Sequence, residues 1–426
     1  MSNPTLALIP SGYQGGSTPK VYSILPNDGS GDFTYDRDTP TNGTRVRKDG
    51  LIEQMGNDVP RLNWLNSNCP SLLLEPQRTN LAHYSEQIDN AYWIKTNVSV
   101  TANQTTSPDG TLSADKLQRT STGSDRLAKA FTKTASEAQN FALSVFVKKG
   151  DSRYATLSLQ GNYPDRAYLQ YDFEQNIINA SIDFEDFTIL STKAENYNNG
   201  WVRLSFAVST DAHSSVTVLI SPKNDAVTAA LSDSSDSCFM YVWGVQLEKD
   251  TYSTSYIKTE SSTSTRNSDD CKIDNFGSMP SNYPITVYGE VLPIELSTNS
   301  HAFSLLKNVD TSGSYYLSLE LTSTTGLKIK RRDADTDDAD TISHTLAVGT
   351  PFKFAVCFQN ETDYKYSFDG LSAVSVTTSD TVTWDYNDVL LGTLRLVSDT
   401  GSRNPIKDFR LYDTELTDAQ LTELTK

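Results

Sequence analysis

Short segments in which apolar and polar side chains alternate recur along the chain, with turn residues between them. The clearest runs from residue 352 to 359, where Phe, Phe, Val and Phe alternate with Lys, Ala, Cys and Gln. A period of two places successive side chains on opposite faces of a β-strand. Strands with one buried and one solvated face are typical of antiparallel sheets. We therefore expect an all-β protein built from antiparallel β-sandwich, or jelly-roll, domains.

Two such strand sets are separated by a run without apolar side chains. The first set is expected at residues 141–148, 154–159, 167–173, 201–208, 216–220 and 239–247. The second is expected at residues 285–291, 352–359, 364–368, 389–397 and 406–412. Between Ile257 and Cys271 the chain is polar and rich in Ser and Thr, so this run cannot build a core. The sequence predicts sandwiches over residues 91–260 and 272–426, joined by a linker at 261–271.

The two ends of the chain follow different patterns. Residues 1–90 hold only short strand-like pieces, punctuated by Pro, Gly, Asn and Asp. Pieces this short bury too little surface to offset the entropy of ordering them. We therefore predict an extended attachment and oligomerisation region that other chains order. Near the C-terminus, Thr417 and Gln420 match a helix capping box, which predicts a short final helix.

Charge and cysteine usage exclude several classes of protein. The net charge is −17, and the densest basic cluster, at residues 328–332, is followed at once by an Asp-rich run. Nucleic-acid-binding proteins usually carry a larger basic footprint, so no nucleic acid partner is expected. The four cysteines lie far apart, which indicates neither a zinc site nor a disulfide framework. No apolar stretch approaches the length needed to span a membrane, and no secretory signal is indicated.

Several motifs resemble those of known proteins. The runs GDFTYDR (31–37), TRVRKDGLIE (44–53), NDVPRLNW (57–64) and CPSLLLEPQRTNL (69–81) are similar to the N-terminal region of tailed-bacteriophage virion appendage proteins. The strand WGVQLE (243–248), followed by TSYI (254–257), resembles the carbohydrate-binding-module-like sandwiches of such proteins. The resemblance implies a chain made in the host cytoplasm and assembled on the phage particle surface. It also implies a homotrimeric fibre that contacts other virion proteins through residues 1–90.

Each predicted sandwich carries a resemblance of its own. The run SPDGTLSADKL (107–117) is similar to galactose-binding-like jelly rolls of carbohydrate-binding modules. The runs YKYSFDGL (364–371) and IKDFRLYDTELT (406–417) resemble concanavalin A-like, laminin-G-like domains. These resemblances imply a glycan of the host cell surface as ligand, by analogy of fold.

Motifs for catalysis and for cofactors are absent. The sequence has no nucleophile elbow and no phosphate-binding loop, and its four histidines are isolated. Concanavalin-like hydrolases place their carboxylates in an E-x-D-x-x-E strand, and the nearest run here, residues 182–186, lacks the first Glu. We expect no catalytic residues and no enzymatic activity.

One acidic run has the spacing of a calcium loop. Asp333, Asp335 and Asp337 fall at positions one, three and five of such a loop, but positions six and twelve hold Asp338 and His344 instead of Gly and Glu. The favoured interpretation is a solvated hairpin tip, with no metal ligand assigned. A structural calcium elsewhere stays open, and no other cofactor is expected.

Two aromatic residues are the candidates for glycan binding. Tyr163 lies in the run GNYPD (161–165) and Trp384 in the run TWDYN (383–387). Each combines a ring, onto which the C–H face of a sugar can stack, with neighbouring Asn or Asp groups for hydroxyls. The alternative is that each ring anchors its loop on the core, as large aromatic side chains commonly do.

Three functions remain in view. The favoured one is a structural protein of a tailed-phage virion, in a fibre or other appendage of the tail or head, that contributes to host glycan binding. The second is a virion-associated glycan-degrading enzyme. The third is a capsid or collar decoration protein without a ligand.

Overall fold

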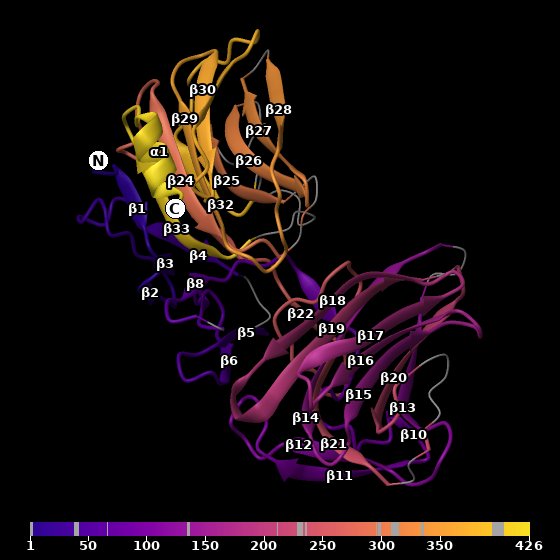
Figure 1. The fold of residues 1–426 in the computed structure, drawn as a ribbon. Helices are drawn as coiled ribbons and strands as arrows, with labels where there is room; N and C mark the ends of the chain where they lie inside the picture. Colours follow the sequence, from indigo (N-terminus) through magenta and orange to yellow (C-terminus); the bar gives the residue numbers. More distant parts are fainter. Residues whose placement is uncertain are drawn as a thin grey trace. The chain divides into compact units, whose positions relative to one another are not determined.

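The computed structural model describes residues 3–37, 42–65, 67–133, 137–210, 212–227, 233–234, 237–294, 296, 300–307, 315–333, 336–393 and 404–426. The chain divides into two compact units. Unit 1 comprises Met1–Thr41, Met55–Gln77 and Asn267–Lys426, and unit 2 comprises Asn42–Gln54 and Arg78–Arg266. The fold is almost entirely β-structure, as the alternating pattern predicts (Figure 1).

Unit 2 is a sandwich of two six-stranded antiparallel sheets. The β16 sheet has the order β10(Ile94–Thr96), β13(Arg126–Thr132), β20(Ser215–Lys223), β15(Tyr154–Gln160), β16(Arg166–Asp172) and β17(Ile177–Phe184). The β21 sheet has the order β11(Val98–Thr105), β12(Ala114–Arg119), β21(Phe239–Glu248), β14(Asn140–Lys149), β19(Trp201–Ser209) and β18(Thr188–Asn196). Apolar side chains from both sheets form one buried core between them, including Leu157, Val218, Val145 and Leu204.

Two short pairings complete unit 2. Strand β5(Gly43–Val46) pairs with β6(Ile52–Met55), and β9(Arg78–Asn80) pairs with β22(Ser264–Arg266). The sequence assigned Ser264–Arg266 to a linker. Ser and Thr are compatible with strand structure, and here their backbone groups complete a ladder without contributing apolar side chains.

Unit 1 is a sandwich of an eight-stranded and a nine-stranded sheet. The first contains β31(Val374–Thr377), β30(Asp363–Phe368), β29(Phe352–Phe358), β24(Ile285–Val291), β33(Ile406–Tyr412), β8(Ser71–Leu72) and β7(Leu62–Asn63), with β1(Leu6–Leu8) also paired to β33. The second contains β2(Tyr13–Gln14), β3(Lys20–Val21), β4(Phe33–Asp36), β23(Asp270–Ile273), β32(Asp388–Leu391), β25(His301–Leu306), β26(Tyr316–Ser323), β27(Gly326–Arg332) and β28(Asp337–Ser343). Phe303 and Phe354 stack between the sheets, with ring centroids 5.5 Å apart.

The first ninety residues differ in the structure from the separate arm that the sequence predicts. Strand β1 pairs with β33, placing Leu6 opposite Leu411 and Leu8 opposite Phe409. Leu6, Leu8 and Phe33 are fully buried in the core of unit 1. The early pieces are too short to bury a core among themselves, but they complete sheets whose other strands come from the end of the chain.

The predicted boundary at residues 261–271 is corrected in the same way. Cys271 lies in strand β23, which pairs with β4 on one side and β32 on the other. A short apolar alternation, with Cys271 and Ile273 buried, marks this strand in the sequence but stands at the edge of the polar run. The second sandwich therefore begins before residue 272 and includes strands from the start of the chain.

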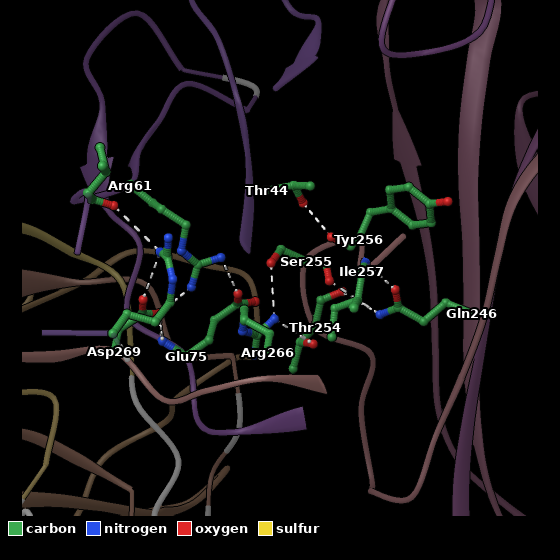
Figure 2. Close-up of polar contacts among 12 residues, drawn as sticks. Thr44, Arg61, Glu75, Gln246, Thr254, Ser255, Tyr256, Ile257, Arg266 and Asp269 are labelled. Carbon is green, nitrogen blue, oxygen red and sulfur yellow. Dashed lines mark hydrogen bonds and ion pairs between the residues drawn. The ribbon is translucent and has the colours of Figure 1, made fainter. Parts of the chain in front are cut away.

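A buried ionic network joins these early strands to the segment before β23. The Arg61 guanidinium pairs with Asp269 and lies 2.7 Å from the Glu75 carboxylate, as Figure 2 shows. The Asp269 carboxylate also accepts a hydrogen bond from the Glu75 backbone N–H at 2.9 Å. Arg61 and Asp269 are completely buried. Burial alone would lower the pKa of Arg61, but Asp269 and Glu75 raise it, so the guanidinium remains charged.

The closing strand of unit 2 is held by its own polar side chains. The side-chain oxygen of Gln246 accepts from the Ile257 backbone N–H at 2.7 Å. The side-chain NH2 group of Gln246 donates to the backbone carbonyl of Ser255 at 3.3 Å (Figure 2). Arg266 donates to the Thr254 hydroxyl at 3.0 Å. Gly244 has a φ of +64°, and a Cβ there would approach the Phe146 ring to 2.9 Å. The motif residues of 243–257 therefore fix the chain's return from β21.

The C-terminal helix confirms its predicted start. In α1(Asp418–Leu424) the Thr417 hydroxyl accepts from the Gln420 backbone N–H, and the Gln420 side chain accepts from the Thr417 backbone N–H. Leu416 and Leu421 are buried beside this cap. Among the described residues, no helix is long and apolar enough to cross a membrane.

Candidate functional site

Tyr163 presents an exposed ring at one end of the β16 sheet. It lies in the loop 161–165 between β15 and β16, and 77% of its surface is exposed. Two backbone hydrogen bonds close this loop. Gly161 N–H donates to the Asp165 carbonyl oxygen at 2.9 Å, and Asp165 N–H donates to the Asn162 carbonyl oxygen at 2.7 Å. The short closed loop lifts the ring into solvent.

Arg166 supports the ring from the first position of β16. Its guanidinium carbon lies 4.8 Å from the centre of the Tyr163 ring and 4.0 Å from the centre of the Phe184 ring. The guanidinium donates to the Tyr168 hydroxyl at 3.0 Å and to the Pro164 carbonyl at 2.5 Å. Burial raises the pKa of Tyr168, so its hydroxyl is neutral at pH 7 and accepts from Arg166. Arg166 is itself buried, so its guanidinium is held in place and supports the exposed ring from below by a cation–π contact.

His213 links the two polar residues that flank Tyr163. The Asn162 amide lies 3.1 Å from His213 Nδ1, and His213 Nε2 lies 3.3 Å from the Asp165 carboxylate. Asn162 and Asp165 therefore contact the two different nitrogens of the His213 ring. Asp165 also accepts from the Asp186 backbone N–H at 3.3 Å. The loop is therefore braced from both sides, while Asn162 remains exposed.

Arg166, Phe184 and His213 were not among the predicted site residues. Phe184 lies opposite Arg166 in the register of β16 and β17, and His213 comes from the turn before β20. Register between strands depends on side chains and turns across the whole sheet, so a single strand's sequence does not reveal it. A signal that did exist was the alternation of Arg166, Tyr168 and Gln170 on one face of β16.

Trp384 occupies a different kind of place in unit 1. It is half-buried and packs against the core, with the Tyr283 and Tyr386 ring centroids 5.1 and 5.0 Å away. The neighbouring Thr383 donates to Asp333 from its backbone N–H and its hydroxyl, at 2.9 and 3.0 Å. Trp384 and Tyr163 belong to different units, and only Tyr163 presents most of its ring to solvent.

Some of the predicted alternatives can be located. Asp333 is buried and accepts hydrogen bonds, whereas Asp335 lies outside the described residues. Among the residues that the structure does describe, no three His, Cys, Asp or Glu side chains are grouped to hold a metal ion. All four cysteines are free, and three of them are buried. Trp93, Trp201 and Trp243 are fully buried.

Comparison with known proteins gives likenesses of structure alone. No family model matches the chain, and no curated protein does so. The carbohydrate-binding module CBM40 of a Ruminococcus gnavus IT-sialidase, bound to α2,3-sialyllactose, is 14% identical with a TM-score of 0.32, covering 35% of this chain and 87% of the module. Domain 4 of AbnA, a GH43 arabinanase from Geobacillus stearothermophilus in complex with arabinotriose, is 19% identical with a TM-score of 0.31, covering 37% and 73%.

An animal protein is also similar. The heptameric SAP-like pentraxin of Limulus polyphemus is 12% identical with a TM-score of 0.28, covering 34% of this chain and 71% of its own. TM-scores at this level say nothing about a ligand, so function has to be argued from the residues themselves.

Proposed function

We propose that the protein is a non-enzymatic structural component of a tailed-phage virion that binds host cell-surface glycan through the Tyr163 loop. The observation that carries the binding part is the ring of Tyr163, 77% exposed and supported by the buried Arg166. Large aromatic rings usually bury most of their surface. The apolar face of an exposed ring is in contact with water, and it becomes buried when a flat apolar face of a ligand stacks on it.

The surroundings of the ring suit a sugar. A sugar ring has a C–H face for stacking and hydroxyls around its edge, so its partner needs an aromatic face bordered by hydrogen-bonding groups. Asn162 is exposed beside Tyr163, and its side chain is oriented by His213. Groups that are already held in place lose little entropy on binding, which favours affinity.

The virion part of the proposal rests on the motifs of residues 31–81 and their resemblance to phage appendage proteins. The early strands β1, β4, β7 and β8 are already paired within unit 1. Contacts of residues 1–90 with other virion proteins therefore fall to exposed side chains such as Tyr22 and Ile24, at 38% and 47% exposure. In a fibre we expect three copies of the chain.

The test is glycan binding by full-length Tyr163→Ala. We expect the affinity to fall by about 1 to 3 kcal/mol, the scale of losing a large side chain's contact area. The melting temperature should stay unchanged, since an exposed ring contributes little to the core. Tyr22→Ala, which removes another exposed tyrosine, is the matched control and should bind as the parent does.

Each part of the proposal has an outcome that contradicts it. If Tyr163→Ala binds every glycan on an array as the parent does, the assigned site is wrong. Release of products from host polysaccharide would show an enzyme instead. Electron microscopy of virions labelled with an antibody to this chain tests the location, and unlabelled particles would overturn it.

A further inference from the structure

Acidic residues lie in and beside the Tyr163 loop. The loop that follows β17 carries Glu185 and Asp186, both exposed. Asp165 belongs to the ring's own loop, and its carboxylate lies 3.3 Å from His213 Nε2. Basic groups that contact the loop include the buried guanidinium of Arg166 and the imidazole of His213.

The acidic loop is held beside the ring. Phe184 and Tyr163 both contact the Arg166 guanidinium, at 4.0 and 4.8 Å. The residue after next, Asp186, is hydrogen-bonded through its backbone to the Asp165 carboxylate at 3.3 Å. Glu185 lies between these two anchors. The backbone of this acidic segment is therefore held next to the Tyr163 loop, and the side chains of Glu185 and Asp186 are both exposed.

The one full positive charge is not available to an anion. Arg166 is buried, and its guanidinium donates to Tyr168 and Pro164 while aromatic rings cover it. The carboxylate of Asp165 is also engaged, because it contacts His213 and accepts a hydrogen bond from the Asp186 backbone N–H. Glu185 and Asp186, in contrast, are exposed to solvent in the segment next to this loop.

We infer that the Tyr163 surface selects uncharged glycans and rejects those whose contacting sugar carries a carboxylate or a sulfate. The inference rests on the proposed function, because it specifies what the same surface binds. Charges within about 10 Å of each other are incompletely screened at physiological salt, so like charges at the rim weaken binding. Juxtaposed like charges are a common means of excluding the wrong partner.

The experiment uses the full chain and pairs of oligosaccharides that differ by one acidic residue, such as lactose and sialyllactose, across an array of such pairs. We expect the uncharged member of each bound pair to bind at least about tenfold more tightly, equivalent to about 1.4 kcal/mol. Raising the salt concentration should narrow the difference by strengthening binding of the acidic member.

The decisive variant is Glu185→Gln combined with Asp186→Asn. Both side chains are exposed, so the fold should be retained, which melting checks. We expect the preference to shrink to about threefold or less while binding of uncharged members stays constant. Lys193→Gln with Glu195→Gln, on the neighbouring β18, is a control that should leave the preference intact.

Two different failures are distinguishable. Acidic members that bind as tightly as their uncharged partners, or a preference that survives Glu185→Gln with Asp186→Asn, would overturn this inference and leave glycan binding standing. A parent protein that binds no oligosaccharide of either kind would overturn the proposed function, and this inference with it. Binding that persists undiminished in Tyr163→Ala would place the glycan elsewhere and overturn both assignments to this surface.

Discussion

The guanidinium of Arg166 lies 4.8 Å from the centre of the Tyr163 ring, with one residue buried and the other exposed. The two residues have different roles, one in the stability of the fold and the other in the exposed surface. Arg166 belongs to the sheet and gives the loop a rigid base, whereas Tyr163 contributes little to the fold and presents its ring to solvent. Substitutions at the two positions should therefore have opposite consequences.

Arg166→Ala should destabilise unit 2. It removes the hydrogen bonds to Tyr168 and Pro164 and leaves three rings without their shared cation. We expect unfolding to become easier by about 2 to 4 kcal/mol, measured by urea denaturation. Arg47→Ala removes an arginine whose ion pair with Asp49 is half-exposed and should change stability by no more than about 1 kcal/mol. Equal effects of the two would show that Arg166 is not a support.

Trp384→Ala should behave as a core substitution. Its ring packs against Tyr283 and Tyr386 at the edge of the unit 1 core. We expect a loss of about 2 to 4 kcal/mol in unfolding free energy, somewhat below the range for fully buried aromatics because the ring is half-buried. A variant that melts like the parent but loses glycan binding would instead make Trp384 a ligand contact.

The buried ionic network should be sensitive to its central carboxylate. In Asp269→Asn, the guanidinium groups of Arg37 and Arg61 remain buried and lose their shared negative partner. Arg61 keeps its ion pair with Glu75, whereas Arg37 loses the carboxylate that it faces, and breaking a buried ion pair costs about 3 to 5 kcal/mol. Asp49→Asn, at the exposed pair with Arg47, is the control. If urea denaturation gave the same small loss of unfolding free energy for Asp269→Asn and Asp49→Asn, the network would not be needed for stability.

Acid should weaken unit 1 through His301. Burial, and then Lys330, lower the pKa of this histidine to about 3, while the unfolded chain takes up the proton near pH 6.5. Between about pH 6.5 and pH 3 the unfolded state therefore binds more protons, and stability falls as the pH falls. From pH 7 to pH 5 the loss is about 2 kcal/mol.

His301→Gln should remove this part of the acid sensitivity. Urea unfolding at both pH values measures it. Ser304→Ala, on the same strand, removes a hydrogen bond to Thr393 without removing a titrating group, so its effect should be equal at both pH values. A His301→Gln variant that loses as much stability on acidification as the parent would contradict this assignment.

A fragment of residues 272–426 should not fold alone. It lacks Leu6, Leu8 and Phe33, which complete its core, and it leaves one edge of β33 without strands β1 and β8. We expect an insoluble product, or one without cooperative melting, and partial rescue when residues 1–77 are co-expressed. A fragment that is soluble and melts cooperatively would show that the early strands are accessory.

The long strands and the final helix were predictable because their signals are local. Phe352–Phe358 alternates within a single strand, and Thr417 and Gln420 cap a helix that begins beside them. The early strands are two to four residues long, and no period can be recognised in Leu62–Asn63 or Ser71–Leu72. Their structure comes from partners that are remote in sequence, such as Ile406 opposite Leu72.

The candidate site was predictable only at its centre. Tyr163 stood out as a ring among turn residues, which is a local feature. The residue that supports the Tyr163 ring was not predictable. In the sequence Arg166 is only one residue of an alternating strand, and its contact with Phe184 depends on the pairing of β16 with β17. The distinction between Tyr163 and Trp384 likewise depends on which rings lie nearby, and Tyr283 is about a hundred residues away from Trp384 in the chain.

The pairing of β1 with β33 also sets a schedule for synthesis. Leu6 and Leu411 are about 400 residues apart, and ribosomes add roughly 5 to 20 residues per second. The first strand therefore waits about 20 to 80 seconds for its neighbour, and unit 1 forms its complete sheets only after residue 411 has been synthesised. A chain interrupted before residue 411 would leave Leu6 and Leu8 without this partner strand and therefore exposed to proteases.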